Sequence, residues 1–177
     1  MDALLLIDLQ EDFLSAPALA ERRPALVAAV RRWVERAQAQ GALVVELRTE
    51  LDPDPSTWAL NMRDDEQPIA LAGSPGARRI HELADLEADL VVKSRDDGFL
   101  GTDLADRLHA AGVEQLVVAG VSTQACVALT AAGAYAHDFR VSLAEDAVAS
   151  DDPEAHEAAL RWLEREYRQQ VLPLEDS

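Results

Sequence analysis

The chain has 177 residues, of which 33 are acidic and 16 are basic, so its formal charge near neutral pH is −17. That length fits one domain with a sizeable core, and we expect a single domain over residues 1–177. The negative charge repels nucleic acid and anionic membrane, which argues against both as partners.

Features of secreted and membrane proteins are absent from the sequence. A single cysteine excludes an internal disulfide framework. No apolar run reaches the roughly 20 residues that span a bilayer, and the sequence starts without the basic region of a signal peptide. The expected location is the cytoplasm.

The first quarter of the chain has the pattern of a β–α–β unit. Residues 3–7 are apolar and predict a buried strand that ends at Asp8. Apolar residues at helical spacing predict a helix over 24–40, with Pro24 in its first turn, and a second strand follows at 42–47. This order implies a right-handed crossover and a parallel sheet. Asp8 then lies at the carboxyl end of its strand, where ligands bind in open α/β sheets.

Residues 48–76 are polar and rich in proline. A loop of that length in a compact domain is usually functional, for example as a lid or a substrate wall. Trp58 is its apolar landmark, and it either anchors the loop or contacts a ligand. The segment has no His-x-His, Asp-x-His or cysteine-pair spacing, so no built-in zinc or iron site is predicted.

The rest of the chain repeats the alternation of strands and helices. Six short strands between helices predict a three-layer α/β/α domain with a doubly wound, mainly parallel, Rossmann-like six-stranded sheet. The acidic tail is expected to fray. The further expected elements are strands over 89–92, 116–119, 139–143 and 170–172, a polar turn over 144–147, and helices over 77–83, 104–111, 123–137 and 154–168, the last capped by residues 150–153.

The only cysteine of the chain follows the fourth predicted strand. Gly120 ends this strand, and Ser122 or Thr123 is expected to cap the next helix, which places Cys126 in its first turn. Unpaired backbone N–H groups and the positive end of the helix dipole favour the nucleophilic thiolate there. The same N–H groups could hold an oxyanion. The alternative is an inert core cysteine, and this stretch alone leaves both interpretations open.

Lys93 follows the third strand in the way that Asp8 follows the first. Taken alone, a lysine at a strand end is usually a surface residue. In a doubly wound sheet, however, the carboxyl ends of neighbouring strands converge, so Asp8, Lys93 and Cys126 are expected to meet. A carboxylate can take the proton of a nearby thiol, and an ammonium near both keeps the carboxylate charged. The three residues together predict a nucleophilic site.

These strand ends carry ordered motifs: Asp8-x-Gln10-x-x-Phe13, then Lys93, then Gly120-Val121-Ser122-Thr123-x-x-Cys126-Val127. The set resembles the isochorismatase-like cysteine hydrolases, which include nicotinamidases, N-carbamoylsarcosine amidases and ureidoacrylate amidases. The resemblance extends over most of the chain, from Leu5 to about Ala159.

The resemblance implies a role for each residue. Cys126 is the nucleophile, Asp8 the general base and Lys93 the positioning cation. The Val121–Ser122 peptide bond would be cis and would direct the N–H groups of Ser122 and Cys126 into an oxyanion hole. The implied reaction is hydrolysis of a small-molecule amide or related C–N bond through a thioester, without a cofactor. Relatives are commonly dimers or tetramers, so a homo-oligomer is expected.

Two departures from the family bear on the substrate. Nicotinamidases carry an Asp/His/His metal set after the second strand, whereas Glu50 to Gln67 contains no histidine. Nicotinamide is therefore a poor substrate candidate, and no metal is expected. After Lys93, many relatives place an aromatic and small residues where this chain has Asp96 and Asp97. A cationic substrate follows if either one faces the pocket, and a solvated loop is the alternative.

The remaining expectations concern the pocket and the competing functions. Phe13, Trp58 and Phe99 are the candidate pocket walls. A second hypothesis keeps the fold and pocket but makes the protein a non-catalytic binding or interaction module, although it retains all three chemical residues. Nucleotide binding is weaker, because no Gly-x-Gly-x-x-Gly or Gly-x-x-x-x-Gly-Lys-Ser/Thr pattern follows any strand.

Overall fold

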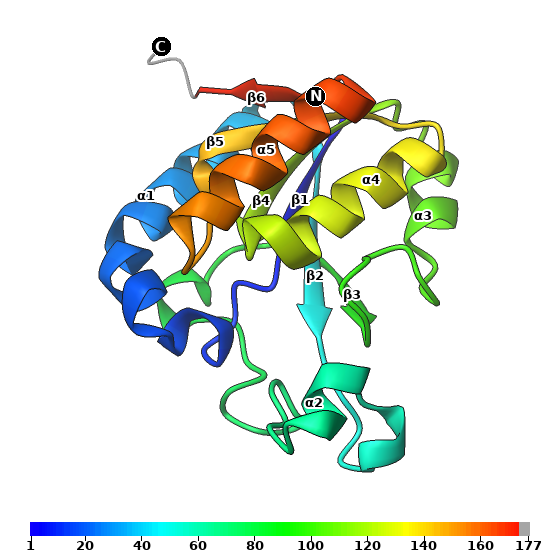
Figure 1. Ribbon diagram of the computed structural model, residues 1–177. Helices are drawn as coiled ribbons and strands as arrows, with labels where there is room; N and C mark the ends of the chain where they lie inside the picture. The colour runs from blue at the N-terminus through cyan, green and yellow to red at the C-terminus, as the bar shows by residue number, and fades with distance from the viewer. Residues whose placement is uncertain (174–177) are drawn as a thin grey trace.

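The computed structural model describes residues 1–173, and these form a parallel six-stranded sheet with helices on both faces (Figure 1). The strand order is β3-β2-β1-β4-β5-β6, which confirms the predicted doubly wound α/β/α class. The acidic tail, residues 174–177, lies outside the described residues. The strands are β1 (Ala3–Ile7), β2 (Leu43–Thr49), β3 (Asp89–Lys93), β4 (Gln115–Val121), β5 (Arg140–Ala149) and β6 (Gln170–Leu172).

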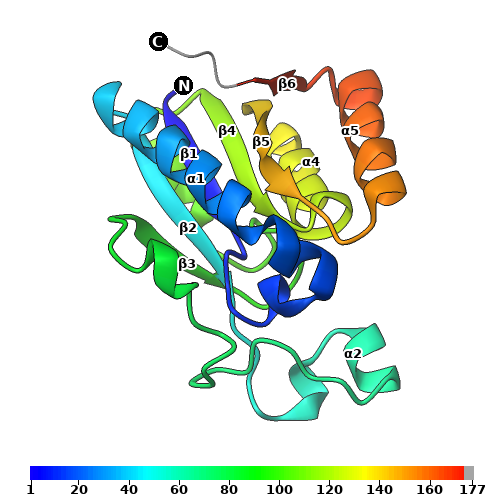
Figure 2. The same ribbon diagram turned by 90° about the vertical axis from the view of Figure 1, so that its left-hand side faces the viewer.

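The helices pack in two layers because β1 presents alternate residues to opposite faces of the sheet. Leu4 and Leu6 belong to the apolar cluster under α1, whereas Leu5 and Ile7 belong to the cluster under α3, α4 and α5. Figure 2 shows α1 on one side of the sheet and α4 and α5 on the other. The helices are α1 (Pro17–Ala39), α2 (Leu60–Asp64), α3 (Leu104–Ala110), α4 (Ala128–Ala136) and α5 (Pro153–Tyr167).

Strand register brings the ends of β1 to β4 to one level. From β1 the chain moves to β2 and β3 on one side and then crosses to β4, so the strand order reverses between β1 and β4. Ile7 pairs with Leu47 on β2 and with Gly120 on β4, and Thr49 pairs with Lys93. The residues that follow these positions therefore face the crevice at the topological switch point.

The first helix begins earlier than predicted. α1 starts at Pro17, so Pro24 lies inside the helix and not in its first turn. Pro17 and Pro24 both precede apolar residues at helical spacing, and a proline is favoured in the first turn of a helix, so the sequence fits a start at either residue. The earlier proline is the one at the start of the helix, and Leu19 is already buried in the core.

The fifth strand is longer than predicted, because the polar segment 144–147 is strand and not a turn. Its pairing with β4 shifts between Val118 and Gly120, as in a bulge. Asp146 accepts hydrogen bonds from the indole Nε1 of Trp33 at 2.7 Å and from Arg32 at 2.8 Å. The polar residue thus finds its partners on α1, a long-range contact that the local sequence does not encode.

Other expected local features differ in detail. The segment 77–83 holds only a 3₁₀ turn, His81–Leu83. A π-helical turn, Thr123–Val127, precedes α4, and neither Ser122 nor Thr123 caps it through its side chain. The predicted cap of the last helix is present: the Asp152 carboxylate accepts from the N–H groups of Glu154 and Ala155.

No helix within residues 1–173 is long and apolar enough to cross a membrane. The cytoplasmic location, the single domain and the homo-oligomer remain predictions.

A buried ion cluster joins β2 to the segment that precedes β3. The Glu46 side chain is 3% exposed and accepts hydrogen bonds from Arg48 and Arg79. Burial alone would raise the pKa of Glu46, but the two guanidinium groups outweigh it and hold this pKa below its ordinary value. A carboxyl with a lowered folded-state pKa stabilises the fold above its unfolded pKa, and this contribution is lost as the pH falls through the folded pKa.

We expect Glu46→Gln to lower the free energy of unfolding near neutral pH by about 3 kcal/mol, because it removes the buried carboxylate that two partly buried guanidinium groups share. Urea unfolding near neutral pH and at a pH below the ordinary glutamate pKa checks the expectation, since the unfolded chain then binds a proton at Glu46 and the stabilising contribution of this carboxyl declines. The matched control is Glu50→Gln, which removes a more exposed partner of Arg48 at 3.5 Å and should cost under about 1 kcal/mol. An equal loss for Glu46→Gln at both pH values would contradict the assignment.

Candidate functional site

Asp8, Lys93 and Cys126 lie together where β1, β3 and β4 end. The ammonium Nζ of Lys93 is 2.8 Å from Asp8 Oδ2 and 3.5 Å from Cys126 Sγ. The side chains of Asp8 and Lys93 are fully shielded from solvent, and Cys126 is 5% exposed. The structure thus brings together the three residues that the strand ends predict.

Thr49, at the end of β2, bonds to both members of the Asp8–Lys93 pair, and no sequence motif identifies it as a site residue. Its hydroxyl donates to Asp8 Oδ1 at 2.8 Å and accepts from Lys93 Nζ at 2.7 Å. Its backbone N–H donates to Asp8 Oδ1 and to Gln10 Oε1. The Gln10 amide in turn donates to the backbone oxygens of Thr49 and Ala77. These bonds hold the Asp8 carboxylate in one orientation toward Lys93.

The charges of the site favour a protonated Lys93 beside a neutral Cys126 thiol. Burial would lower the pKa of Lys93, but the charge and hydrogen bond of Asp8 outweigh it and raise this pKa. Burial also raises the pKa of the Cys126 thiol, the Asp8 and Asp96 carboxylates add to that rise, and Lys93 opposes it. The resting sulfur is therefore a thiol and not the thiolate expected at a helix start. Desolvation and two carboxylates outweigh the backbone N–H groups there.

The turn that carries Cys126 has the geometry that the resemblance implies. The Val121–Ser122 peptide bond is cis. Ser122 and Cys126 both line one cleft, and the role of their N–H groups as an oxyanion hole remains a prediction. Thr123 is fully buried within the turn, and its hydroxyl lies 2.8 Å from Nδ1 of His156 at the start of α5. Helix α5 thus contacts the turn through His156.

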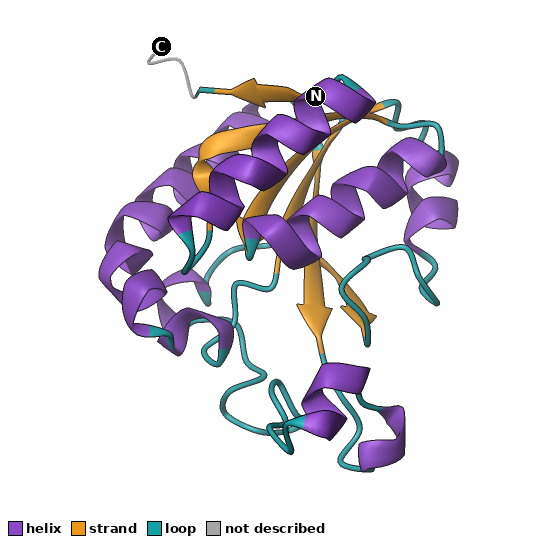
Figure 3. Cartoon of the chain, in the orientation of Figure 1, coloured by secondary structure: helices purple, strands orange, loops and turns teal. Residues whose placement is uncertain are grey.

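A cleft of about 480 Å³ opens onto the Cys126 sulfur. Part of its lining comes from the segment after β1 and part from residues 61–69, in and after α2. The segment 48–76 thus borders the cleft, and its role as a lid or substrate wall remains a prediction. Figure 3 shows these loops beyond the carboxyl ends of the strands. The cleft is lined by residues that include Phe13, Met62, Ile69, Asp96, Ser122 and Cys126.

The three aromatic residues proposed as pocket walls take different places. Phe13 lines the cleft. Phe99 is 7% exposed and stacks on His137 and Phe139, with ring centroids 5.0 and 6.0 Å apart, so it packs in the core. The Trp58 indole donates to the backbone oxygen of Asp52 at 2.8 Å, which anchors its own loop. Within the described residues, only Phe13 of these three lines the cleft. The sequence does not determine whether a loop turns an aromatic ring toward the core or toward a cleft.

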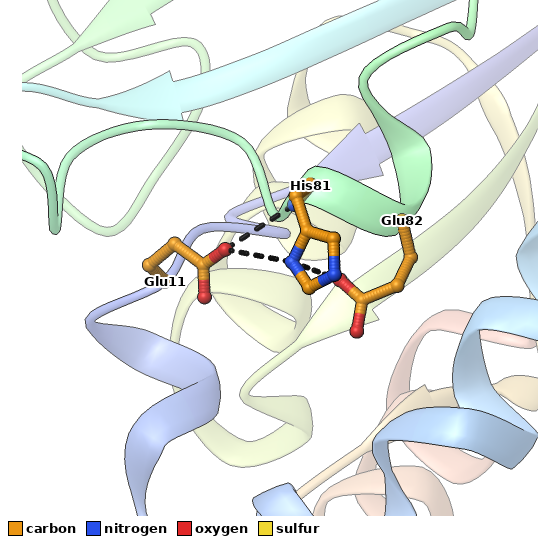
Figure 4. Close-up of side chains that lie close together, drawn as sticks. All are labelled: Glu11, His81 and Glu82. Atoms are coloured by element: carbon orange, nitrogen blue, oxygen red, sulfur yellow. Dashed lines mark hydrogen bonds and ion pairs between the residues drawn. The ribbon is translucent and has the colours of Figure 1, made fainter.

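Glu11, His81 and Glu82 form a second cluster of polar side chains (Figure 4). Their ligand atoms lie within 4.8 Å of one another, a spacing that a metal ion could use. However, the Arg23 guanidinium already binds both carboxylates, at 2.8 Å from Glu11 and 2.6 Å from Glu82. Because the Arg23 guanidinium already occupies both carboxylates and would repel a cation placed between them, the cluster is an ion-pair network that joins α1 to the segment before β3, and the donor set does not fit a metal.

Comparison with known proteins gives a consistent result. The isochorismatase domain matches residues 2–174. Streptothricin hydrolase from Streptomyces noursei is 35% identical over 158 residues, which are 86% of this chain but only 56% of that protein. A probable inactive nicotinamidase from Arabidopsis thaliana is 34% identical over 165 residues, or 88% of this chain and 84% of that protein. The crystal structure of pyrazinamidase of Pyrococcus horikoshii in complex with zinc is 30% identical and superposes with a TM-score of 0.83, over 97% of this chain and 98% of that one.

Proposed function

Because the chain belongs to the isochorismatase family, we propose that it hydrolyses a small-molecule amide or related C–N bond through a thioester on Cys126. The observation that carries the proposal is the contact of Lys93, itself paired with Asp8 in the core, with the sulfur of Cys126, a residue that lines a cleft. The names of streptothricin hydrolase and pyrazinamidase, both similar to this chain, agree with hydrolysis.

In the proposed reaction, the sulfur of Cys126 attacks the carbonyl carbon while its proton passes to the Asp8 carboxylate. A resting thiol needs such a base, and Asp8 is near enough to influence the Cys126 thiol by both charge and hydrogen bonding. Lys93 stays protonated and holds Asp8 in place. The N–H groups of Ser122 and Cys126 stabilise the oxyanion.

Collapse of the tetrahedral intermediate breaks the C–N bond. The leaving nitrogen takes the proton from Asp8 and departs as ammonia or an amine, which leaves a thioester on Cys126. Water then attacks the thioester, with Asp8 acting as the base for a second time. This step releases the carboxylic acid and returns the proton to the sulfur, so the enzyme is unchanged after one cycle.

The zinc of the pyrazinamidase structure is not carried over to this chain. Residues between Glu50 and Gln67 include no histidine. Arg23 holds the carboxylates of the Glu11–His81–Glu82 cluster within the described residues. The proposed reaction therefore has no step through a metal.

One relative favours a second candidate function, a binding module without turnover. The similar protein from Arabidopsis thaliana is named as a probable inactive nicotinamidase. The same fold and cleft could bind a small molecule without cleaving it. Against this stands the complete set of Asp8, Lys93 and Cys126, in which Lys93 contacts both of the other residues.

A generic acyl donor tests the proposal without knowledge of the natural substrate. We expect p-nitrophenyl acetate to acetylate Cys126 and the thioester to hydrolyse, so that p-nitrophenolate release continues beyond one equivalent of protein. Because Cys126 is the only cysteine, the intact mass of acid-quenched samples identifies the thioester, and hydroxylamine should remove it. A stable acetyl group on Cys126, or no labelling there, would support the binding module instead.

A further inference from the structure

The cleft wall next to the reactive sulfur carries a carboxylate. Asp96 lines the cleft, and its Oδ1 lies 3.6 Å from Cys126 Sγ. Within residues 1–173, Asp96 takes part in no ion pair. The neighbouring guanidinium of Arg95 is engaged elsewhere, since it donates to the backbone oxygens of Thr57 and Ser94 at 2.9 and 2.6 Å. The charge of Asp96 is therefore available to a ligand.

Charge balance leaves Asp96 as the uncompensated charge beside the sulfur. Asp8 and Lys93 are 2.8 Å apart and their opposite charges largely cancel. Two further carboxylates, Asp12 and Asp65, line the cleft, and its described lining includes no lysine, arginine or histidine. Asp12 also serves the fold, because its Oδ2 accepts from the Ala70 N–H at 2.8 Å. A substrate that reaches the sulfur thus meets a wall of net negative charge.

Asp97, the next residue, provides a useful contrast. Its Oδ1 accepts from the Phe99 N–H at 2.9 Å, and its carboxylate packs against Gly133 of α4. Asp97 therefore faces the protein body, whereas Asp96 faces the cleft. The acidic pair of one loop is divided between a structural role and a position beside the nucleophile.

We propose that Asp96 selects amides that carry an ammonium or similar cationic group near the scissile carbonyl. This inference rests on the proposed function and specifies its substrate class. The Asp96 side chain is exposed to solvent, but it lies beside the sulfur, so its carboxylate attracts a cation and repels an anion that reach this point. A volume of about 480 Å³ suits a small molecule. Neutral amides gain nothing from Asp96, and anionic amides are disfavoured.

Charged thiol reagents measure this selectivity at the sulfur itself. Cys126 is the only cysteine, so methanethiosulfonates with a trimethylammonium-ethyl or a sulfonatoethyl group label one site, and intact mass gives each rate. We expect Asp96→Asn to lower the ratio of the cationic to the anionic rate about tenfold. The ratio cancels the change in thiolate fraction that follows because Asp96 also raises the pKa of Cys126.

Asp97→Asn is the matched control, because it removes the same charge from the same loop but from the side away from the cleft. It should change the ratio by less than about twofold. An unchanged ratio in Asp96→Asn, or an equal fall in both variants, would overturn the proposal.

A ligand series extends the test from reagents to amides. β-Alaninamide, propionamide and succinamate differ mainly in carrying a cation, no charge or an anion. We expect β-alaninamide to slow alkylation of wild-type Cys126 by iodoacetamide at the lowest concentration of the three, and Asp96→Asn to reduce its advantage over succinamate about tenfold. An equally large advantage of β-alaninamide in both proteins would overturn the proposal. If the wild-type protein does not turn over p-nitrophenyl acetate, by contrast, the proposed hydrolase is contradicted. The ratio of the cationic to the anionic labelling rate does not depend on that result.

Discussion

Cys126→Ala is expected to lower amide turnover by a factor on the order of 10⁴ to 10⁶, because every bond-forming step of the proposed reaction passes through this sulfur. The variant should still fold. Cys126 is 5% exposed in the core cluster under α4, and loss of one buried sulfur should cost only about 1 kcal/mol. Steady-state turnover of an amide substrate and urea unfolding of the same preparation check the two expectations together.

Cys126→Ser separates the shape of the side chain from its chemistry. Serine keeps an atom in the position of the sulfur and a proton to give to Asp8, but its hydroxyl is much less acidic than a thiol. We therefore expect turnover to fall to near the level of Cys126→Ala, with stability close to that of the wild type. Turnover in Cys126→Ala within about tenfold of the wild type would show that another group attacks the substrate, and the thioester mechanism would be wrong.

The sequence predicts the meeting of Asp8, Lys93 and Cys126 because three apolar runs have clear ends. In a parallel sheet, the residue after each run lies at the same edge as the residues after its neighbours. The structure places β1, β2 and β4 side by side with Ile7 level with Leu47 and Gly120. Chemistry that stands directly after a strand is thus positioned by topology alone, without knowledge of any side-chain contact.

Residues whose roles depend on contacts between distant segments were not predictable in this way. Thr49 is an ordinary strand residue until its register with Lys93 places its hydroxyl between two charges. Phe99 follows a glycine in a polar loop, and the direction of its ring depends on His137 and Phe139. The local sequence around Cys126 also does not predict a neutral thiol, because the rise in its pKa comes from burial and from carboxylates on other segments.

The second large effect is expected from Lys93→Met, which removes the charge and retains most of the side-chain volume. The Lys93 ammonium is fully buried and bonds to Asp8 Oδ2, the Thr49 hydroxyl and the backbone oxygen of Arg95. Without it, the Asp8 carboxylate is buried beside an apolar group. We expect the free energy of unfolding to fall by about 3 to 5 kcal/mol near neutral pH, as for other buried ion pairs that lose one partner. Urea unfolding measures the loss.

The double variant Asp8→Asn/Lys93→Met distinguishes the structural role of this pair from its chemical one. Replacing both charges removes the unpaired carboxylate, and the amide oxygen introduced in place of the Asp8 carboxylate could still accept from the Thr49 N–H and hydroxyl. About half or more of the lost stability should therefore return. Turnover should not return, because neither a base for the Cys126 thiol nor a cation that orients it remains.

If the double variant regained turnover along with stability, Asp8 and Lys93 would be scaffold for the cleft and the base would lie elsewhere. If it stayed as unstable as Lys93→Met, the loss would come from the packing of residue 93 and not from the uncompensated charge of Asp8.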